Sequence, residues 1–451
     1  MKNINSCIIE NFLSIFRDKD QVYMHVKYTM SSRSNVVDFI HRPNYITIMK
    51  RLQAYKFELK LSRGQKRILK GFAGSCRYVY NKSLALQKER YEKSEKKLNY
   101  AGLCKQLTAW RHDLKLDWLS RTPSQALQQS LKDLERAYEN FFKKRSEFPR
   151  FKKKGRQDAF RLPQGFKLDQ INSRVFLPKL GWLCYRNSRK VEGKLCNVTI
   201  SQSCDKWFAS FQTEREVIEP VHPSTTAIGV DVGIAQFATL SDGHIFHPVH
   251  SFQSRQSSLI KWQRRLSKKK KFSKNWKKAV FQVSRVHRKI AHVRQDYLHK
   301  ITHTISKNHA MVCVEDLQIK NMSQSASGTL ARPGKQVKAK SGLNKAILDQ
   351  GWYEFRRQLE YKQRWRGGMV IAVSPHYTSQ KCSECNYIDS GNRLTQSEFK
   401  CINCKYENHA DIVAAINILR AGHAQLACGE MVRLDHSMNQ EPTEVTQAKV
   451  A

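Results

Sequence analysis

Three acidic residues lie at positions where the surrounding sequence is apolar. Asp231 lies inside an apolar segment, Glu315 directly follows a second one, and Asp411 directly precedes a third. Carboxylates are depleted in strands and are costly to bury without a partner. Taken singly, each acid has an ordinary structural explanation. Asp411 can cap a helix, and the other two can end their strands or pair with lysines.

Taken together, the three acids predict a site for divalent metal ions. Carboxylates that come from two strands and a helix, and that converge at one end of a sheet, form an oxygen cage suited to Mg²⁺. Two such ions about 4 Å apart can activate a water and stabilise the leaving oxygen in phosphodiester cleavage. We therefore expect Asp231, Glu315 and Asp411 to hold two Mg²⁺ ions and to carry out phosphodiester hydrolysis.

Four cysteines form a second candidate metal site. Cys382 and Cys385 make one Cys-x-x-Cys pair, Cys401 and Cys404 make another, and the fifteen residues 386–400 separate the pairs. This spacing is typical of tetrahedral zinc. Because four thiolates complete the coordination shell, we expect one structural Zn²⁺ with no position for a catalytic water. A redox pair and a chance pattern are the alternatives.

The remaining cysteines and the hydropathy bear on the location of the protein. Eight of the 12 cysteines are scattered along the chain, which is typical of reduced thiols. No apolar run approaches the roughly 20 residues that span a bilayer, and the N-terminus lacks the features of a signal peptide. We therefore expect a cytoplasmic protein without a membrane partner.

The charge of the chain predicts a polyanionic partner. Its 451 residues include 80 Lys and Arg against 38 Asp and Glu, which leaves a net charge of +42. Nucleic acid is the usual partner of such a protein. A ribosome-associated protein and a basic protein of a membrane surface are the alternatives.

Two basic clusters are candidates for contact with nucleic-acid phosphates. Aromatic residues are interleaved with the second cluster, which favours a nucleic-acid-binding bridge over a solvated helix face. The first cluster is Arg150, Lys152, Lys153, Lys154 and Arg156; the second is Lys268, Lys269, Lys270, Lys271, Lys274, Lys277 and Lys278.

The elements that must position these residues indicate an α/β multidomain protein. Residues 227–233, 311–317 and 369–373 are typical of buried strands, and residues 237–246 of a hairpin whose turn is Asp242-Gly243. Residues 321–342 are rich in Ser, Gly and Lys, and we expect them to be mobile. Helices are expected over 63–95, from Pro123 onward, over 255–300, over 344–363 and over 411–421, and short strands over 158–222.

Seven ordered strings resemble the TnpB family, the transposon-encoded RNA-guided nucleases related to type V CRISPR effectors. Together they cover the chain from about Met49 to Gly422. They are RLQAYKF (51–57), FAGSCRYVYN (72–81), PSQALQQ (123–129), GVDVG (229–233), VEDL (314–317), YTSQKC (377–382) and DIVAAINIL (411–419).

The resemblance implies an architecture and a set of roles. It implies an RNase H-like RuvC nuclease domain over 226–425, in which Asp231, Glu315 and Asp411 match the metal-binding acids and a zinc ribbon at about 376–408 precedes the last acid. It also implies a wedge-like β domain over 49–225 (about 49–62 and 158–225) with a helical recognition insert over about 63–157. Residues 321–342 would be a lid over the nuclease site. Met49 is a candidate initiator, so residues 1–48 are treated as an extension that the native protein can lack, and 426–451 as a disordered tail.

The resemblance further implies an RNA-guided, Mg²⁺-dependent DNA endonuclease encoded by an insertion sequence and associated with transposition. Its partners would be a guide RNA from the element's own transcript and a target double-stranded DNA with a short flanking motif. One alternative is an RNA-independent transposase. The other is an RNA-guided DNA-binding regulator whose cleavage is weak or lost.

Three residues depart from the family pattern. The family commonly has Asn two residues after the last acid, where this chain has Val413. If that Asn supports the metal site, cleavage would be slow or lost. Asn386 and Lys405 replace the glycines that usually follow the two Cys-x-x-Cys pairs, and a left-handed turn suits Asn better than Lys.

Overall fold

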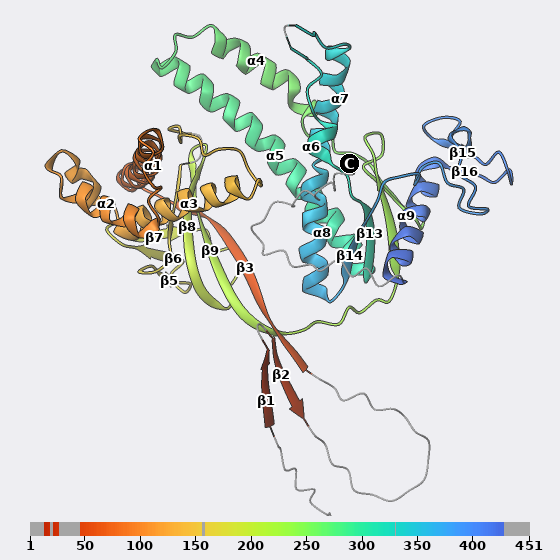
Figure 1. Ribbon diagram of the computed structural model, residues 1–451, viewed down its shortest axis with the longest axis horizontal. Coiled ribbons are helices and arrows are strands. Elements are labelled where there is room, and N and C mark those ends of the chain that lie inside the picture. The colour runs from red at the N-terminus through yellow and green to blue at the C-terminus, as the bar shows by residue number, and fades with distance from the viewer. Residues whose placement is uncertain (1–12, 19–20, 27–45, 156–157, 330, 428–451) are drawn as a thin grey trace, which may run out of the picture. The chain divides into compact units, whose positions relative to one another are not determined.

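The computed structural model describes residues 13–18, 21–26, 46–155, 158–329 and 331–427 (Figure 1). They belong to two compact units, the first ending at Ile218 and the second beginning at Glu219. Arg156 lies outside the described residues, as do residues 428–451 of the expected tail. No helix in the described part of the chain is both long enough and apolar enough to cross a membrane.

A nine-stranded sheet is the frame of the first unit. Its longest strand, β3, pairs antiparallel with β9 along most of its length. Tyr55, Phe57 and Leu59 of β3 are buried, whereas the residues between them are more exposed, as the period of a strand requires. The order is β4-β8-β9-β3-β7-β6-β5, with β2 and then β1 attached to β3. The bounds are β1 Leu13–Asp18, β2 Gln21–Val26, β3 Ile46–Lys60, β4 Ala159–Leu162, β5 Lys167–Asp169, β6 Arg174–Leu177, β7 Gly181–Tyr185, β8 Lys194–Ser203 and β9 Lys206–Ile218.

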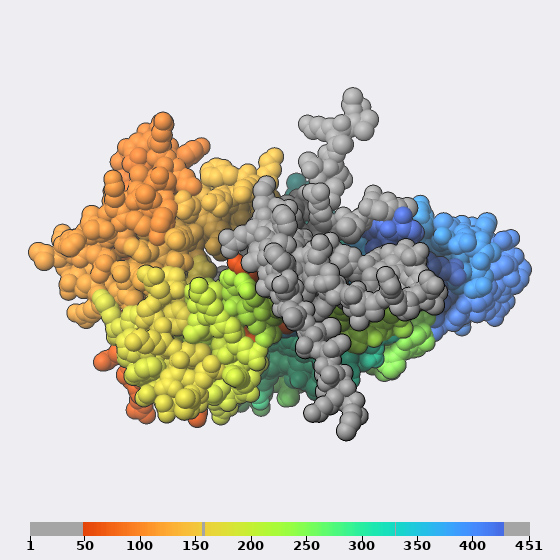
Figure 2. Space-filling view, turned by 90° about the horizontal axis from the view of Figure 1, so that it is seen from below, coloured from red at the N-terminus to blue at the C-terminus, as the bar shows by residue number. Residues whose placement is uncertain are grey.

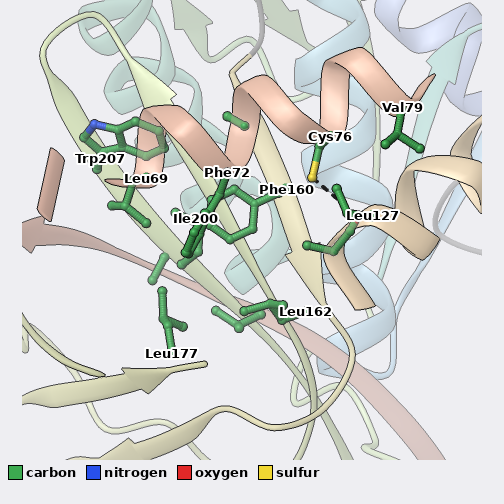
Figure 3. Close-up of a cluster of buried hydrophobic side chains, with 14 of the residues drawn as sticks. Leu69, Phe72, Cys76, Val79, Leu127, Phe160, Leu162, Leu177, Ile200 and Trp207 are labelled. Carbon is green, nitrogen blue, oxygen red and sulfur yellow. Dashed lines mark hydrogen bonds between the residues drawn. The ribbon is translucent and has the colours of Figure 1, made fainter. Parts of the chain in front are cut away.

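Helices pack on this sheet and complete the core of the first unit. The longest, α1, is capped by Ser62, whose side chain and that of Gln65 form a capping box. Its apolar stripe, which includes Leu69 and Phe72, packs against Phe160 of β4 in the core shown in Figure 3. The helices are α1 (Arg63–Glu92), α2 (Tyr100–His112), the 3₁₀ helix η1 (Leu114–Arg121) and α3 (Ser124–Phe142).

The second unit has a mixed five-stranded sheet between helices. Its order is β12-β11-β10-β13-β14; β10, β13 and β14 are parallel, and β11 and β12 are antiparallel. On β13, Val312 and Val314 join the core formed with α5 and α8, whereas Met311 and Cys313 join the core formed with α9. The sheet is therefore buried on both faces, which explains its continuous apolar strands. The bounds are β10 Ala227–Val232, β11 Ala238–Leu240, β12 Ile245–Phe246, β13 Met311–Glu315, β14 Met369–Val373, α5 Lys274–Asn308, α8 Trp352–Arg366 and α9 Ala410–Ala427.

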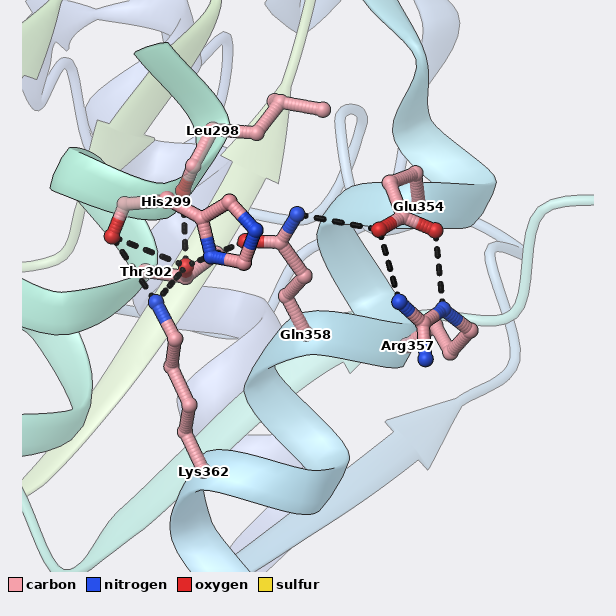
Figure 4. Close-up of polar contacts among 7 residues, drawn as sticks. All are labelled: Leu298, His299, Thr302, Glu354, Arg357, Gln358 and Lys362. Carbon is pink, nitrogen blue, oxygen red and sulfur yellow. Dashed lines mark hydrogen bonds and ion pairs between the residues drawn. The ribbon is translucent and has the colours of Figure 1, made fainter. Parts of the chain in front are cut away.

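A buried polar network joins α5 to α8 (Figure 4). Thr302 donates to Gln358 at 3.0 Å, and the Lys362 ammonium donates to Thr302 at 2.7 Å and to the carbonyl of His299 at 2.8 Å. Gln358 in turn donates to Glu354 at 3.0 Å. Burial lowers the pKa of Lys362 to about 8. The network satisfies polar groups between two helices that otherwise pack through apolar side chains.

Two of the expected helices are interrupted. The stretch expected over 255–300 consists of α4 (Gln256–Ser267) and α5, with 268–273 between them. Phe272 has a left-handed backbone, and Ser273 caps α5 by accepting from the amide of Trp276. Four consecutive lysines repel one another in a helical turn, which favours an exposed connection here. The helix expected over 344–363 is likewise divided into α7 (Val337–Gln350) and α8, because Gly351 adopts φ +75°.

The other expected elements of the second unit are present. The hairpin turn at Asp242-Gly243 joins β11 to β12, and Gly243 has φ +88°. Residues 337–342 of the Ser-, Gly- and Lys-rich segment belong to α7. Lys340 and Asn344 of this helix donate to carbonyls of residues 322–324, next to α6 (Ile319–Met322).

Candidate active site and cysteine site

The strand order places two of the predicted acids at one edge of the sheet. Asp231 is the penultimate residue of β10, and Glu315 is the last residue of β13. The two strands are parallel and Val230 pairs with Val314, so the acids are next to each other at the carboxyl ends. The third acid, Asp411, is in the first turn of α9, which packs on β10.

Close approach between α9 and β10 is possible because position 229 is glycine. A Cβ atom there would lie 2.0 Å from the carbonyl oxygen of Ala415 and 2.9 Å from Leu419. Any larger residue would push the helix away from the strand. Gly229 therefore helps to hold Asp411, at the start of the helix, close to Asp231 on the strand.

The pKa directions are those expected of carboxylates that influence one another. Burial, and then the charges of Glu315 and Asp411, raise the pKa of Asp231 to about 7, while the Arg393 guanidinium acts in the opposite direction. Burial also raises the pKa of Glu315, against a hydrogen bond that favours its charged form. Three neighbouring carboxylates offer hard oxygen ligands and repel one another without a cation. This set of donor atoms fits Mg²⁺.

Two residues from the cysteine module (376–408) contact these acids. The hydroxyl of Thr378, which is buried, donates to Oε1 of Glu315 at 2.6 Å. The guanidinium of Arg393 lies 3.4 Å from Oδ1 of Asp411. Asn417 of α9 donates to the backbone carbonyls of Thr378 and Lys381, at 2.9 and 2.7 Å, and so fixes the start of the module.

The sequence offered uneven signals for these three contacts. Thr378 lies in the string YTSQKC, directly before the first cysteine, but nothing in that string points to Glu315. Asn417 follows Asp411 by six residues and is the polar residue of the stretch 412–419, so its polarity was a signal. Arg393 lies in the irregular spacer between the cysteine pairs, where no periodicity predicts a partner.

The four cysteines meet as the spacing predicts. Their sulfur atoms all lie within 4.8 Å of one another, with Cys382 and Cys404 at 3.6 Å and Cys385 and Cys401 at 3.5 Å. Disulfide bonding requires about 2.05 Å, so these are free thiols. Tetrahedral zinc with Zn–S bonds of about 2.3 Å places its sulfurs about 3.8 Å apart, which fits the cluster.

The backbone around the cysteines supports such a site. The amides of Glu384 and Cys404 point at the sulfurs of Cys382 and Cys401, at 3.4 Å each. Asn386 and Lys405 both have a left-handed backbone, with φ of +61° and +63°, as expected of positions that the family fills with glycine. The module also contains η3 (Ser390–Asn392) and the strands β15 (Glu398–Lys400) and β16 (Glu407–His409). In Figure 2 the blue residues, which include this module and α9, form one lobe.

Val413 belongs to the apolar packing of the cysteine module. It is fully buried in a cluster with Cys382, Phe399, Cys401 and Ala410.

Among the residues that the structure describes, the four cysteines form a group of at least three ligand atoms within 4.8 Å, and the three acids do not.

The basic clusters differ in what they contact. Lys268 to Lys271 are exposed in the connection between α4 and α5, and Lys274, Lys277 and Lys278 are exposed at the start of α5. Phe272 is 74% exposed and packs on Trp276, with their ring centroids 5.5 Å apart.

In the first cluster, two of the predicted residues already have partners. Arg150 pairs with Glu147, and the Lys152 ammonium lies 4.0 Å from the centre of the Tyr80 ring. The backbone of Lys152 exchanges hydrogen bonds with Asn81, and burial lowers the pKa of its side chain. Lys153 and Lys154 are exposed.

Sequence comparison places most of the chain in known families. Residues 49–97 match a family described as a helix-turn-helix domain of OrfB_IS605, residues 210–326 one described as a probable transposase, OrfB_IS605, and residues 352–418 the Cas12f1-like TNB domain. The second match includes Asp231 and Glu315, and the third includes the four cysteines and Asp411. Residues 49–97 form most of β3, all of α1 and the start of the connection to α2. The region matched to a helix-turn-helix domain therefore contains one helix in this structure.

Two relatives match over almost their whole length. A protein of Escherichia coli (strain K12), named "Putative RNA-guided DNA endonuclease InsQ", is 58% identical over 400 residues, which are 89% of this chain and 100% of the relative. A protein of the same description from Streptomyces pristinaespiralis is 34% identical over 87% of this chain and 97% of its own.

Comparison with solved structures shows the same fold at low sequence identity. The cryo-EM structure of a Cas12f1–sgRNA–target DNA complex aligns with a TM-score of 0.51 and 12% identity, over 82% of this chain and 98% of that chain. Fold and sites thus define a basic α/β protein with strand-borne acids next to a four-cysteine module. The chain belongs to the TnpB family, of the OrfB_IS605 type.

Proposed function

We propose that the protein is an RNA-guided DNA endonuclease that cleaves its target by two-metal phosphodiester hydrolysis. The observation that carries this proposal is that Asp231 and Glu315 lie at the ends of neighbouring parallel strands, with Asp411 at the start of the helix that packs on β10, and that the pKa of Asp231 is raised to about 7. Buried acids held against one another are costly unless a cation compensates them. The names of the relatives, which cover almost the same length of chain, support the reaction and its RNA guide.

The second unit would be an RNase H-like domain of the RuvC type. Its order of three antiparallel strands followed by two parallel ones, with α9 on one face, supports this assignment. The first unit, in which α1, α2 and α3 are inserted between β3 and β4, would be the wedge-like domain with its recognition insert. The cysteine module would be a zinc ribbon with one structural Zn²⁺.

The acids and the residues around them have separate roles in this proposal. Asp231, Glu315 and Asp411 would hold two Mg²⁺ ions, which supply Lewis acidity and a water of lowered pKa when bound. Thr378 orients the carboxylate of Glu315 by donating to Oε1. The Arg393 guanidinium lies 3.4 Å from Oδ1 of Asp411, so it would compete with a cation for that oxygen. The exposed lysines 268–278 would contact the phosphates of the nucleic acid.

Guide, target and biological setting complete the proposal. The guide would be the transcript of the element that encodes the protein, and the target would be double-stranded DNA beside a short motif. The activity would accompany transposition. The loop between α6 and α7 would cover the nuclease site.

One observation favours a second candidate function. The Arg393 guanidinium lies 3.4 Å from the carboxylate of Asp411. The carboxylate oxygens of the three acids do not all lie within 4.8 Å of one another, as the cysteine sulfurs do. A protein in which this arrangement persisted in the presence of Mg²⁺ would bind guide and target without cleaving. It would act as an RNA-guided DNA-binding regulator.

Reconstitution with the element's own transcript tests these alternatives. A plasmid library with a matched target and randomised flanking sequence is incubated with the protein in Mg²⁺ or chelator, with and without the transcript, beside Asp231→Ala. We expect cleavage only with RNA, Mg²⁺ and the wild-type acid. Guide-dependent binding without cleavage would favour the regulator, and cleavage without RNA would favour the RNA-independent transposase.

A further inference from the structure

A cleft of about 1050 Å³ opens in the first unit, on the side of α1 that faces η1. Its lining comes from α1, from η1 and its C-terminal cap, and from the turn between β6 and β7, and it includes none of the three acids and none of the residues of the two predicted basic clusters. Ligand sites in proteins have volumes of about 300–1,000 Å³, so the cleft is large enough for one or two nucleotides.

The floor of the cleft contains two glycines that the fold of the unit does not require. Gly71 and Gly74 lie three residues apart in the interior of α1, where each costs about 1 kcal/mol relative to alanine. A Cβ atom at Gly71 would meet nothing within 4 Å, and one at Gly74 would meet only the Arg77 side chain, at 3.7 Å. Internal packing therefore gives no reason for glycine at either position. What the glycines provide is open space over a helix surface.

An aromatic wall rises beside this floor. Tyr78, four residues after Gly74, meets Trp118 of η1 edge to face, with their ring centroids 5.0 Å apart. Trp118 is 37% exposed although the rest of η1 anchors the unit through the buried Leu116 and Leu119. Half-exposed aromatic rings next to an open floor are the arrangement on which nucleic-acid bases stack.

The rim of the cleft is positively charged. Lys82, Arg121 and Lys179 contribute to the lining, as does Arg77, whose guanidinium is paired with Asp158 at 2.7 Å; no Asp or Glu lines the cleft among the described residues. Lys82 lies over the rings of Tyr78 and Trp110, at 5.9 and 4.7 Å from their centres. A flat apolar site with a cationic rim matches the chemistry of a base attached to phosphates.

We propose that this cleft binds an unpaired nucleotide of the guide RNA, stacked against Tyr78 and Trp118 with its phosphates at the cationic rim. The inference rests on the proposed function, which supplies the RNA. Duplex DNA and the guide–target hybrid keep their bases stacked inside a helix, whereas loops and bulges of a folded RNA expose theirs. The cleft would thus recognise the folded part of the guide rather than its target-pairing part.

The test fills the cleft without harming the helix. Gly71→Leu places a side chain in the open space and has a better helix propensity than glycine. Gly71→Ala removes the glycine but fills almost nothing, and Lys70→Gln removes an exposed charge from the same helix; both serve as controls. Trp118→Ala, compared with Trp118→Phe, tests the aromatic wall separately. Each full-length variant is checked by thermal denaturation before use.

Two readouts are taken with the element's own transcript: its Kd at fixed salt, and the reactivity of each nucleotide towards base-modifying reagents. We expect Gly71→Leu and Trp118→Ala to weaken binding about tenfold and to expose the same nucleotide, while Gly71→Ala, Lys70→Gln and Trp118→Phe stay near wild type. Wild-type Kd and reactivity in Gly71→Leu would overturn the inference, as would a defect that appears only when target DNA is added. A wild-type protein that does not bind the transcript would overturn the proposed function and this inference together.

Discussion

Among the single residues of the candidate site, Asp231 has the most strongly raised pKa. Its titration is therefore the most direct test of the site at this scale. Its folded-state pKa of about 7 lies well above the usual value of about 3.9 for aspartate. An acid whose pKa is raised by folding favours the unfolded state as it loses its proton. In the absence of metal, Asp231 therefore destabilises the fold progressively as the pH rises from about 4 to about 7.

Asp231→Asn should remove this dependence. We expect the melting temperature of the variant to equal that of wild type near pH 4 and to exceed it by a few degrees above pH 7, when both are measured in chelator. Mg²⁺ should raise the melting temperature of wild type and leave the variant unchanged. A difference that stays constant with pH would show that folding does not raise the pKa of Asp231.

Thr378 acts on the site through Glu315 and is a positioning residue. Loss of its hydroxyl would free the Glu315 carboxylate to rotate, so Thr378→Val should reduce the cleavage rate about 10- to 100-fold. Thr378→Ser, which keeps the donor, should restore most of the rate. The Mg²⁺ concentration for half-maximal cleavage should rise in Thr378→Val while guide and target binding stay unchanged. A loss of binding instead would indicate a purely structural role.

We predict that packing in the cysteine module, and not the metal site, accounts for valine at position 413. It is fully buried between apolar residues of the cysteine module, so Val413→Asn should bury an unpaired amide and cost about 1–3 kcal/mol of stability. Cleavage by the variant should be no faster than that of wild type. Guide-dependent cleavage assays and denaturation of the two proteins, side by side, check both points; faster cleavage would restore the hypothesis that Asn supports the acids.

The positions of the acids and cysteines could be predicted because each stood out against its local sequence. Asp231 interrupts an apolar strand, and the Cys-x-x-Cys spacing is itself a chemical pattern. The contacts of Thr378 and Arg393 could not be predicted, since the hydrogen bond to Glu315 joins residues 63 positions apart and depends on how the module packs. Such contacts belong to tertiary structure and leave no local trace.

At the scale of elements, the predicted strands were found because a strand buried on both faces is apolar throughout. The breaks at 268–273 and at Gly351 were missed for two different reasons. Phe272 has a left-handed backbone, which a phenylalanine does not announce in the sequence. Gly351 was a readable signal, because glycine inside a helical pattern marks a candidate end.

The cysteine module is the element through which metal content and cleavage should be coupled. Cys401→Ser removes one of four sulfurs that lie within 4.8 Å of one another, and structural zinc contributes much of the folding energy of small modules. We expect elemental analysis to show about one zinc per wild-type chain and little in the variant. Cleavage should also be lost, because Thr378 and Arg393 reach the acids from this module.

Cys313→Ser provides the matched control for this prediction. Cys313 is also buried and belongs to the core with α9, but it lies outside the four-cysteine group. The control should keep its zinc. Zinc content unchanged in Cys401→Ser would contradict the assignment of the module as a zinc site.

At the scale of the whole molecule, the net charge of +42 predicts strong binding to any polyanion. It does not identify the basic residues that contact nucleic-acid phosphates directly. Lys268 to Lys271 are exposed, and they lie next to the exposed Phe272 and the start of α5. Four other lysines carry the same charge but are paired with carboxylates at 3.3 Å or less. They are Lys50, Lys93, Lys300 and Lys400.

The salt dependence of DNA binding distinguishes direct phosphate contacts from attraction by the net charge. Each phosphate contact contributes about 0.9 to the slope of log K against log salt for duplex DNA. Replacing Lys268 to Lys271 by Gln should therefore reduce the magnitude of the slope by about 3–4, if all four reach phosphates, and weaken binding most at low salt. Replacing the four paired lysines removes an equal charge and should leave the slope nearly unchanged, because their counter-ions are already protein carboxylates. Equal effects in the two variants, measured by titration of duplex DNA at several salt concentrations, would mean that the net charge alone holds the nucleic acid and that the connection between α4 and α5 is not a binding element.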